Sequence, residues 1–263
     1  MSQHITIAVA THKKYWMPHD TMYLPVHVGA ALSNNDLGYQ RDDRQENSPE
    51  KTTETISHLN HHYSELTALY WAWKNLSSKH IGLAHYRRHF AGNGERGILS
   101  HNQAALLLKK SPIVLPKKRH YYIETLESHY AHTFDPQHLE LLKQTLTDIS
   151  PKYLNSYSQV LQHRSAHIFN MMIMRSDLLD EYCSWLFPIL FAVEKELDYS
   201  NMSDFEARVL GRLSERLMDV WIETHHHRYE EAPFVYMEKV NWLNKGKSFL
   251  EAKFLGKKYS ASF

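Results

Sequence analysis

The chain has 263 residues, of which 43% are hydrophobic and 22% charged, and its formal net charge is +1. This length slightly favours one α/β domain with additions over two small domains, and the near-neutral charge argues against a general nucleic-acid binder. No apolar run approaches the length of about 18 residues that predicts a membrane-spanning helix. The run that begins at Ile5 is expected to be a strand and not part of a signal peptide. The single cysteine, Cys183, rules out an internal disulfide and favours a reducing compartment.

Predicted strands and helices alternate along the chain, as in a mostly parallel sheet with helices on both faces. Apolar runs rich in β-branched residues predict strands at Ile5–Ala10, from His80, at Ile113–Leu115, at Ile168–Met174 and around Val235. Helical spacing of apolar residues predicts helices at Tyr63–Leu76, at Ala104–Lys109, within Tyr121–Ser150, from a cap at Ser176 or Asp177 to about Leu197, from Phe205 to about His225, and over Trp242–Leu255. The polar stretch between Asn34 and Thr55 predicts a long loop.

Two of these strands end in polar residues. The first opens into Thr11, His12 and Lys13, at the point where such a sheet presents its ligand crevice. The strand that begins at His80 ends in His85, Tyr86, Arg87 and Arg88. Arginine suits phosphate oxygens because its planar fork donates two parallel hydrogen bonds. The pattern indicates a phosphate site, and the alternative is a surface strand end whose arginines pair with nearby acids.

Gly92, Gly94 and Gly97 form the spacing G-x-G-x-x-G after a predicted strand, which suggests a dinucleotide site. That site requires the glycines to run directly into a helix and an acidic residue about 20 residues further on. Here helix signals begin only after Ser100, and the region near Pro116 is basic. A dehydrogenase is therefore disfavoured.

Four blocks of the sequence carry a family resemblance. YSELTALYWAWKNL and IGLAHYRRHF are similar to the two signature blocks of the bacterial capsule and O-antigen glycosyltransferases known as domain of unknown function 4422, and YLPVHVGAAL and SDFEARVLGRLSERLMDVWI resemble further blocks. The resemblance implies an α/β fold like that of the A-type glycosyltransferases, with a mostly parallel central sheet, flanking helices and a helical C-terminal part. It predicts one glycosyltransferase domain over residues 1–238.

The polar end of the first strand and the resemblance together give a set of expected donor-binding residues. Some of these residues could have a structural role instead. Glu65 could stabilise its helix as a first-turn acid that interacts with the helix dipole, and His27 could lie in a solvated turn. The set consists of Thr11, His12, Lys13, His27, Gly29, Asn60, Tyr63, Glu65, His85, Arg87 and Arg88.

Inverting sugar transfer needs one carboxylate to take the proton from the acceptor hydroxyl. Asp204, Glu206 and Glu215 are the candidate bases. The first two could instead cap a helix, and Glu215 could instead form an i,i+4 helix pair or a salt bridge at the edge of the core. The sequence contains no D-x-D motif. Arginine and lysine side chains and helix N-termini would then stabilise the negative charge of the leaving diphosphate. No metal ion or other cofactor would be required.

The function implied is transfer of galactofuranose or galactose, with inversion, from a UDP-sugar to a lipid-linked glycan of a capsule or O-antigen polysaccharide. The rival interpretation is a non-catalytic polysaccharide-binding or assembly partner in the same pathway. Residues 239–263 carry six lysines against two acidic groups, which are Glu251 and the terminal carboxylate. The aromatic residues Trp242, Phe249 and Phe254 lie in the same segment. This pattern predicts a basic amphipathic helix that attaches a cytoplasmic enzyme to the inner face of the cytoplasmic membrane, and the alternative is a terminal helix packed on the domain.

Overall fold

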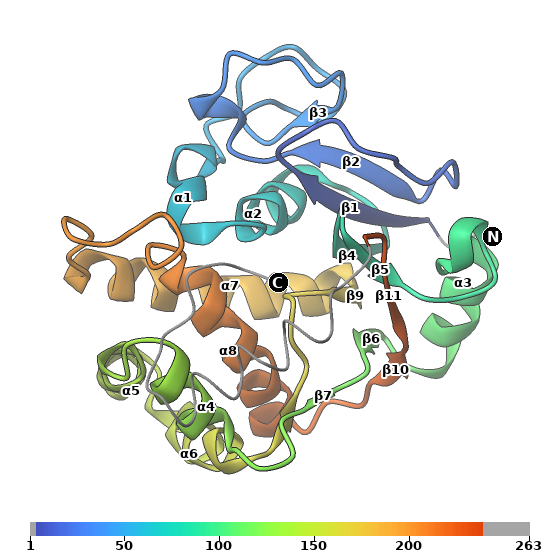
Figure 1. The fold of residues 1–263 in the computed structure, drawn as a ribbon. Helices are drawn as coiled ribbons and strands as arrows, with labels where there is room; N and C mark the ends of the chain where they lie inside the picture. Colours follow the sequence, from blue (N-terminus) through green and yellow to red (C-terminus); the bar gives the residue numbers. More distant parts are fainter. Residues whose placement is uncertain (1–3, 239–263) are drawn as a thin grey trace. The chain divides into compact units, whose positions relative to one another are not determined.

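The structure is a computed structural model that describes residues 4–238, and the described chain forms two compact units (Figure 1). We call residues 4–117, 169–185 and 227–237 the sheet unit, and residues 118–168, 186–226 and 238 the helical unit. Their segments are interleaved, because the chain leaves the sheet unit and returns to it twice. The single domain over residues 1–238 stays a prediction, and the predicted basic helix lies outside the described residues.

The sheet unit is built on a nine-stranded sheet with the main strand order β10-β6-β9-β4-β1-β2-β3. Short strand β5 pairs with both β4 and β11 beside this path. The strands are β1 (Ile5–Thr11), β2 (Tyr23–His27), β3 (Gln40–Arg41), β4 (His80–His85), β5 (Arg88–Phe90), β6 (Ile113–Pro116), β9 (Met172–Arg175), β10 (Glu230–Ala232) and β11 (Phe234–Tyr236).

Strand β1 lies in the middle of a parallel block. It pairs in parallel with β2, with Ile7 opposite Tyr23, and in parallel with β4, with Ile7 opposite Gly82. Residues Ile7, Ala8 and Val9 have no exposed surface, as expected of a parallel strand covered on both faces. Strand β9 is antiparallel to its neighbours β4 and β6. The predicted α/β class with a mostly parallel sheet is confirmed.

The helices of the sheet unit are α1 (Asn60–Tyr63), α2 (Leu66–Asn75), α3 (His101–Lys110) and the first half of α7 (Ser176–Glu196), with single turns η1 (Ala30–Leu32), η2 (Ser57–Leu59) and η3 (Glu95–Gly97). Helix α2 packs against β1 and β4, and its Leu66, Leu69 and Trp71 are fully buried. The single helix predicted over Tyr63–Leu76 is wrong at its start. Ser64, with φ of 53°, separates α1 from α2.

The helical unit contains α4 (Leu126–Thr133), α5 (Gln137–Ile149), η4 (Pro151–Tyr153), α6 (Leu154–Gln162), the second half of α7, α8 (Val209–His225), and the two-stranded pair of β7 (Arg119–His120) with β8 (Ser165–Ala166). Helix α6 contacts α4, α5 and α8. The sequence did not predict α6. Helix α8 begins at Val209, later than the predicted Phe205, because residues 204–208 form turns before it.

Local backbone geometry explains another difference from the predicted elements. The strand expected at Ile168–Met174 begins only at Met172. Phe169 and Asn170, directly before it, both have positive φ, at 75° and 54°, and a left-handed backbone cannot continue a strand. Within residues 4–238, the helices are all too short or too polar to cross a lipid bilayer.

Candidate functional site

Three parallel strands bring most of the predicted donor-binding residues to one edge of the sheet. Because β1, β2 and β4 are parallel, their carboxyl ends meet at the same edge, which is where open α/β sheets bind ligands. Thr11 ends β1, His27 ends β2 and His85 ends β4. The residues that follow each strand, among them His12, Lys13, Gly29, Arg87 and Arg88, therefore gather at this edge.

The two arginines lie in a tight hairpin, not along an extended strand end as the sequence suggested. Tyr86 and Arg87 form the turn between β4 and β5, and Arg88 pairs with His85 across it. The backbone N–H of Tyr86 donates to the carbonyl of Ala10 at 3.1 Å, which ties the turn to the end of β1.

Side chains with positive charge or a titratable ring surround the buried ring of Tyr86. Lys13 Nζ lies 5.1 Å from its centroid, and the guanidinium of Arg87 lies 5.5 Å from it. The ring of His12 meets Tyr86 edge to face at 5.4 Å between centroids. An aromatic face attracts cations, so Tyr86 keeps these groups together at the edge of the sheet.

Arg88 is held by two other rings. Its guanidinium carbon lies 4.4 Å from the ring centroid of Phe169 and 5.7 Å from that of Tyr236. Phe169 directly precedes β9 and Tyr236 belongs to β11, so three distant segments of the sheet unit define the position of this charge. The sequence gave no indication of either ring.

His85 is a neutral imidazole between these cations. Burial, followed by the positive charges of Arg88 and Arg87, lowers its pKa well below the ordinary value. Its Nδ1 accepts a hydrogen bond from the backbone N–H of Arg87 at 3.2 Å. A neutral imidazole that accepts at Nδ1 carries its proton on Nε2, so His85 offers a donor at that atom.

The segment after β2 is organised by Asp42, a fully buried carboxylate in the stretch predicted to be a polar loop. It accepts hydrogen bonds from the backbone N–H groups of Gly29 and Ala30, at 2.9 and 3.0 Å, and from Ser57 Oγ at 2.5 Å. Burial raises the pKa of Asp42 despite these bonds. One of two adjacent aspartates in a polar stretch gives no signal of such a role.

Gly29 and Asn60, both predicted donor-binding residues, contact each other. Gly29 has φ of +66°, and a Cβ there would lie 2.9 Å from Asn60 Oδ1. Asn60 Nδ2 donates to the carbonyl of Ser64 at 2.8 Å and to Thr67 Oγ1 at 3.1 Å. His27, just before this segment, is buried and not in a solvated turn, and burial, followed by the charge of Arg41, lowers its pKa.

The remaining two members of the predicted donor set lie around the break between α1 and α2. Tyr63 is fully buried at the end of α1. Glu65 is half-buried, and its Oε1 accepts a hydrogen bond from Asn170 Nδ2 at 2.8 Å. The sequence did not single out Asn170.

The three candidate bases all belong to the helical unit, whereas the donor-binding set belongs to the sheet unit. Glu206 accepts from Ser203 Oγ at 2.7 Å and from the Ser203 backbone N–H at 3.0 Å. These bonds close a turn and do not cap a helix as the spacing had predicted, because α8 begins only at Val209. Glu215 pairs with the buried Arg216 at 3.0 Å. Asp204 is exposed.

The helical unit also contains a buried ion pair that the sequence did not suggest. His167 Nδ1 lies 2.5 Å from Asp219 Oδ1, and Lys118 Nζ lies 3.6 Å from the same oxygen. Burial alone would raise the pKa of Asp219, but the hydrogen bond from His167 and the charges of His167 and Lys118 lower it. Histidine and aspartate here lie 52 positions apart, which explains why no motif revealed them.

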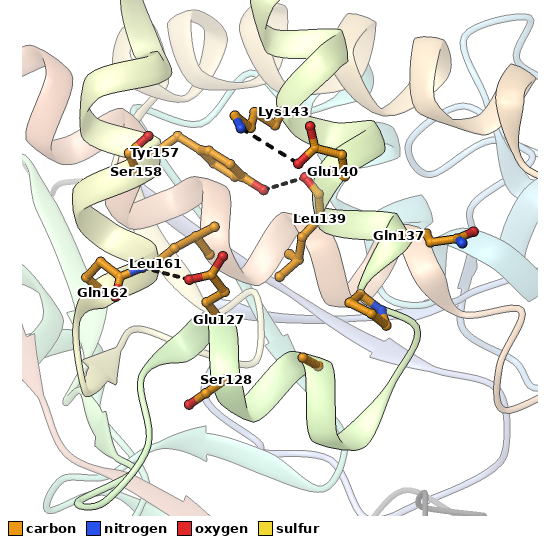
Figure 2. A pocket seen from close by; sticks show the side chains of 12 residues that line it. Glu127, Ser128, Gln137, Leu139, Glu140, Lys143, Tyr157, Ser158, Leu161 and Gln162 are labelled. Atoms are coloured by element: carbon orange, nitrogen blue, oxygen red, sulfur yellow. Dashed lines mark hydrogen bonds and ion pairs between the residues drawn. The ribbon is translucent and has the colours of Figure 1, made fainter.

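A groove of about 750 Å³ lies among α4, α5 and α6 of the helical unit (Figure 2). Its polar side chains bind one another: Gln162 donates to Glu127 at 2.7 Å, and Lys143 lies 3.7 Å from Glu140. The hydroxyl of Tyr157 donates to the carbonyl of Leu139 at 2.7 Å. The groove contains none of the residues predicted to form the site.

Comparisons with known proteins agree with this architecture. Among solved structures, the chain is similar to the WbbM bifunctional glycosyltransferase in its apo form, with a TM-score of 0.79 and 24% sequence identity. The similarity covers 90% of this chain but 46% of that protein, so the chain spans less than half of its length. This likeness confirms the predicted α/β fold with a mostly parallel sheet, similar to that of a glycosyltransferase. A search of curated proteins finds no significant match. The model of the family named domain of unknown function 4422 (DUF4422) matches residues 6–227, and the chain therefore belongs to this family.

Proposed function

We propose that the protein is a glycosyltransferase that moves galactofuranose or galactose, with inversion, from a UDP-sugar to a lipid-linked glycan in capsule or O-antigen synthesis. The observation that carries this proposal is the group of cations at the carboxyl edge of the sheet. Lys13 and Arg87 surround Tyr86, and Arg88 is held between two rings. On a fold similar to that of a glycosyltransferase, this edge is suited to a diphosphate.

The reaction assigns a role to each group. The acceptor oxygen attacks the anomeric carbon opposite the diphosphate, and the bond from that carbon to the diphosphate breaks. Arg87, Arg88 and Lys13 stabilise the charge that develops on the leaving diphosphate. One of Asp204, Glu206 and Glu215 takes the acceptor proton.

Titration with UDP tests the donor class. The purified protein should bind UDP at micromolar to millimolar concentrations, because UDP carries the negatively charged diphosphate that the arginines are proposed to bind. A panel of UDP-sugars assayed with a synthetic lipid-linked acceptor then identifies the sugar. Lack of UDP binding both with and without Mn²⁺ would refute the enzyme interpretation.

We also propose that transfer needs no divalent metal ion. The sequence has no D-x-D motif, and the arginines of the β4–β5 hairpin supply positive charge at the edge where the diphosphate is expected. Activity should therefore survive EDTA. Activity that EDTA abolishes and Mn²⁺ restores would contradict this proposal.

The acceptor suggests where the enzyme works. A lipid-linked glycan presents its reactive end at a membrane surface, and the lysines of residues 239–263 would attract anionic lipid at about 1 kcal/mol each. We propose peripheral attachment to the inner face of the cytoplasmic membrane. Co-sedimentation with anionic liposomes at low salt should separate the full chain from one ending at Lys239, and equal solubility of the two would rule out this attachment.

A further inference from the structure

Glu65 and Asn170 meet at the carboxyl edge of the sheet, although 105 positions separate them in the sequence. Helix α2 begins just after Glu65, packs against β4 and leads into that strand, so Glu65 lies near the end of β4. Strand β9 is antiparallel to β4, with Met172 opposite Leu83. Asn170, two residues before β9 starts to pair, therefore reaches the same edge.

The backbone on both sides of this contact is strained. Ser64 has φ of 53° and ψ of −127°, and Phe169 and Asn170 have φ of 75° and 54°. Residues other than glycine rarely adopt such conformations, because these conformations are energetically unfavourable. The Ser64 carbonyl and N–H both bind Asn60, at 2.8 Å in each case. The fold thus maintains three unfavourable backbone conformations on the two segments that present one carboxylate and one amide together.

The contact between Glu65 and Asn170 also lies beside Arg88, which is predicted to bind phosphate. The guanidinium of Arg88 stacks on the ring of Phe169, the neighbour of Asn170, at 4.4 Å. In a sugar nucleotide the sugar is bonded directly to the terminal phosphate. Groups next to the phosphate-binding arginine are therefore in place to contact the sugar, whereas the nucleoside lies on the other side of the diphosphate.

We propose that Glu65 and Asn170 recognise hydroxyl groups of the transferred sugar, an inference that rests on the proposed sugar-nucleotide donor. A carboxylate accepts hydrogen bonds from hydroxyls, and an amide side chain can both donate and accept. The hydrogen bond between Asn170 Nδ2 and Glu65 Oε1 fixes the orientation of both groups. Together they form a site that selects one pattern of sugar hydroxyls, which hydrogen-bonding sites do more strictly than apolar pockets.

Two variants and two ligands test this assignment. Glu65→Gln keeps the shape but removes the charge, and Asn170→Gly removes the amide while tolerating the left-handed backbone. UDP lacks the sugar, so both variants should bind UDP as the wild type does. The preferred UDP-sugar should bind about 10- to 100-fold more weakly to Glu65→Gln, the range for one lost hydrogen bond to a charged group. Glu54→Gln, an exposed carboxylate of the same unit, serves as the control.

A series of UDP-sugars, each without one hydroxyl group of the sugar, identifies the hydroxyl that each residue binds. The deoxy-donor that lacks the hydroxyl bound by Glu65 should bind equally weakly to wild type and Glu65→Gln. Loss of UDP affinity in the variants would place the pair at the nucleotide and overturn the proposal, as would UDP-sugar binding that neither variant changes. Failure of the wild type to bind UDP would instead refute the donor class itself.

Discussion

Replacing His89 with leucine should make the protein less sensitive to acid. His89 lies on β5 with no exposed surface, and neither of its ring nitrogens has a hydrogen-bond partner among residues 4–238. Burial lowers its pKa from the ordinary 6.5 to about 4. The unfolded chain therefore binds a proton more readily than the folded one. This contribution to stability is complete above pH 6.5 and is lost as the pH falls toward 4.

The size of the effect follows from these two pKa values. Between pH 7 and pH 5, protonation of the unfolded His89 removes about 2 kcal/mol of stability. Leucine cannot take up this proton. At pH 7 the substitution should cost little, because the imidazole forms no hydrogen bond that leucine would remove and a buried polar group without a partner is itself unfavourable.

Urea unfolding at pH 7 and pH 5 measures the effect. The wild type should lose about 2 kcal/mol more than His89→Leu over this interval. Burial also lowers the pKa values of His85 and His129, so the wild type loses more in total, but the difference between the two proteins isolates His89. His58→Leu, on the surface, controls for the loss of a histidine. Equal losses for the wild type and His89→Leu would refute the assignment.

Further substitutions test the sheet edge. Gly29→Ala should lower the free energy of unfolding, measured in urea titrations, more than Gly38→Ala does. Both glycines have positive φ, but only at Gly29 would the new Cβ lie 2.9 Å from Asn60. Equal losses for the two variants would mean that the contact with Asn60 does not affect stability. Arg88→Ala should weaken UDP binding by about 1.5–3 kcal/mol for each charged hydrogen bond lost, measured by calorimetry, and unchanged affinity would remove Arg88 from the site. Asp42→Ala should cost about 1–3 kcal/mol for each backbone N–H left unpaired, seen as a lower urea midpoint, and an unchanged midpoint would contradict its anchoring role.

Local patterns in the sequence were enough to predict the elements that dominate the fold. The β-branched run at Ile5–Ala10 gives β1 almost to the residue, and Ser176 does begin α7. These predictions succeed because burial on both faces demands an unbroken apolar run and because a helix start depends on a few adjacent residues. The apolar run from His80 likewise predicts that Arg87 and Arg88 lie at the end of a strand.

Contacts between distant segments decided what the sequence could not. The apolar spacing of the sequence continues across Ser64. Only the hydrogen bonds between Ser64 and Asn60 show that the predicted helix is interrupted there. Asp42 looks like any loop aspartate until Gly29 and Ala30 donate to it. Glu65 and Asn170 meet only because β9 runs antiparallel to β4. Spacing in a sequence reports the neighbours along one helix or strand, whereas a binding site depends on which strands lie side by side, and that is fixed by the tertiary structure.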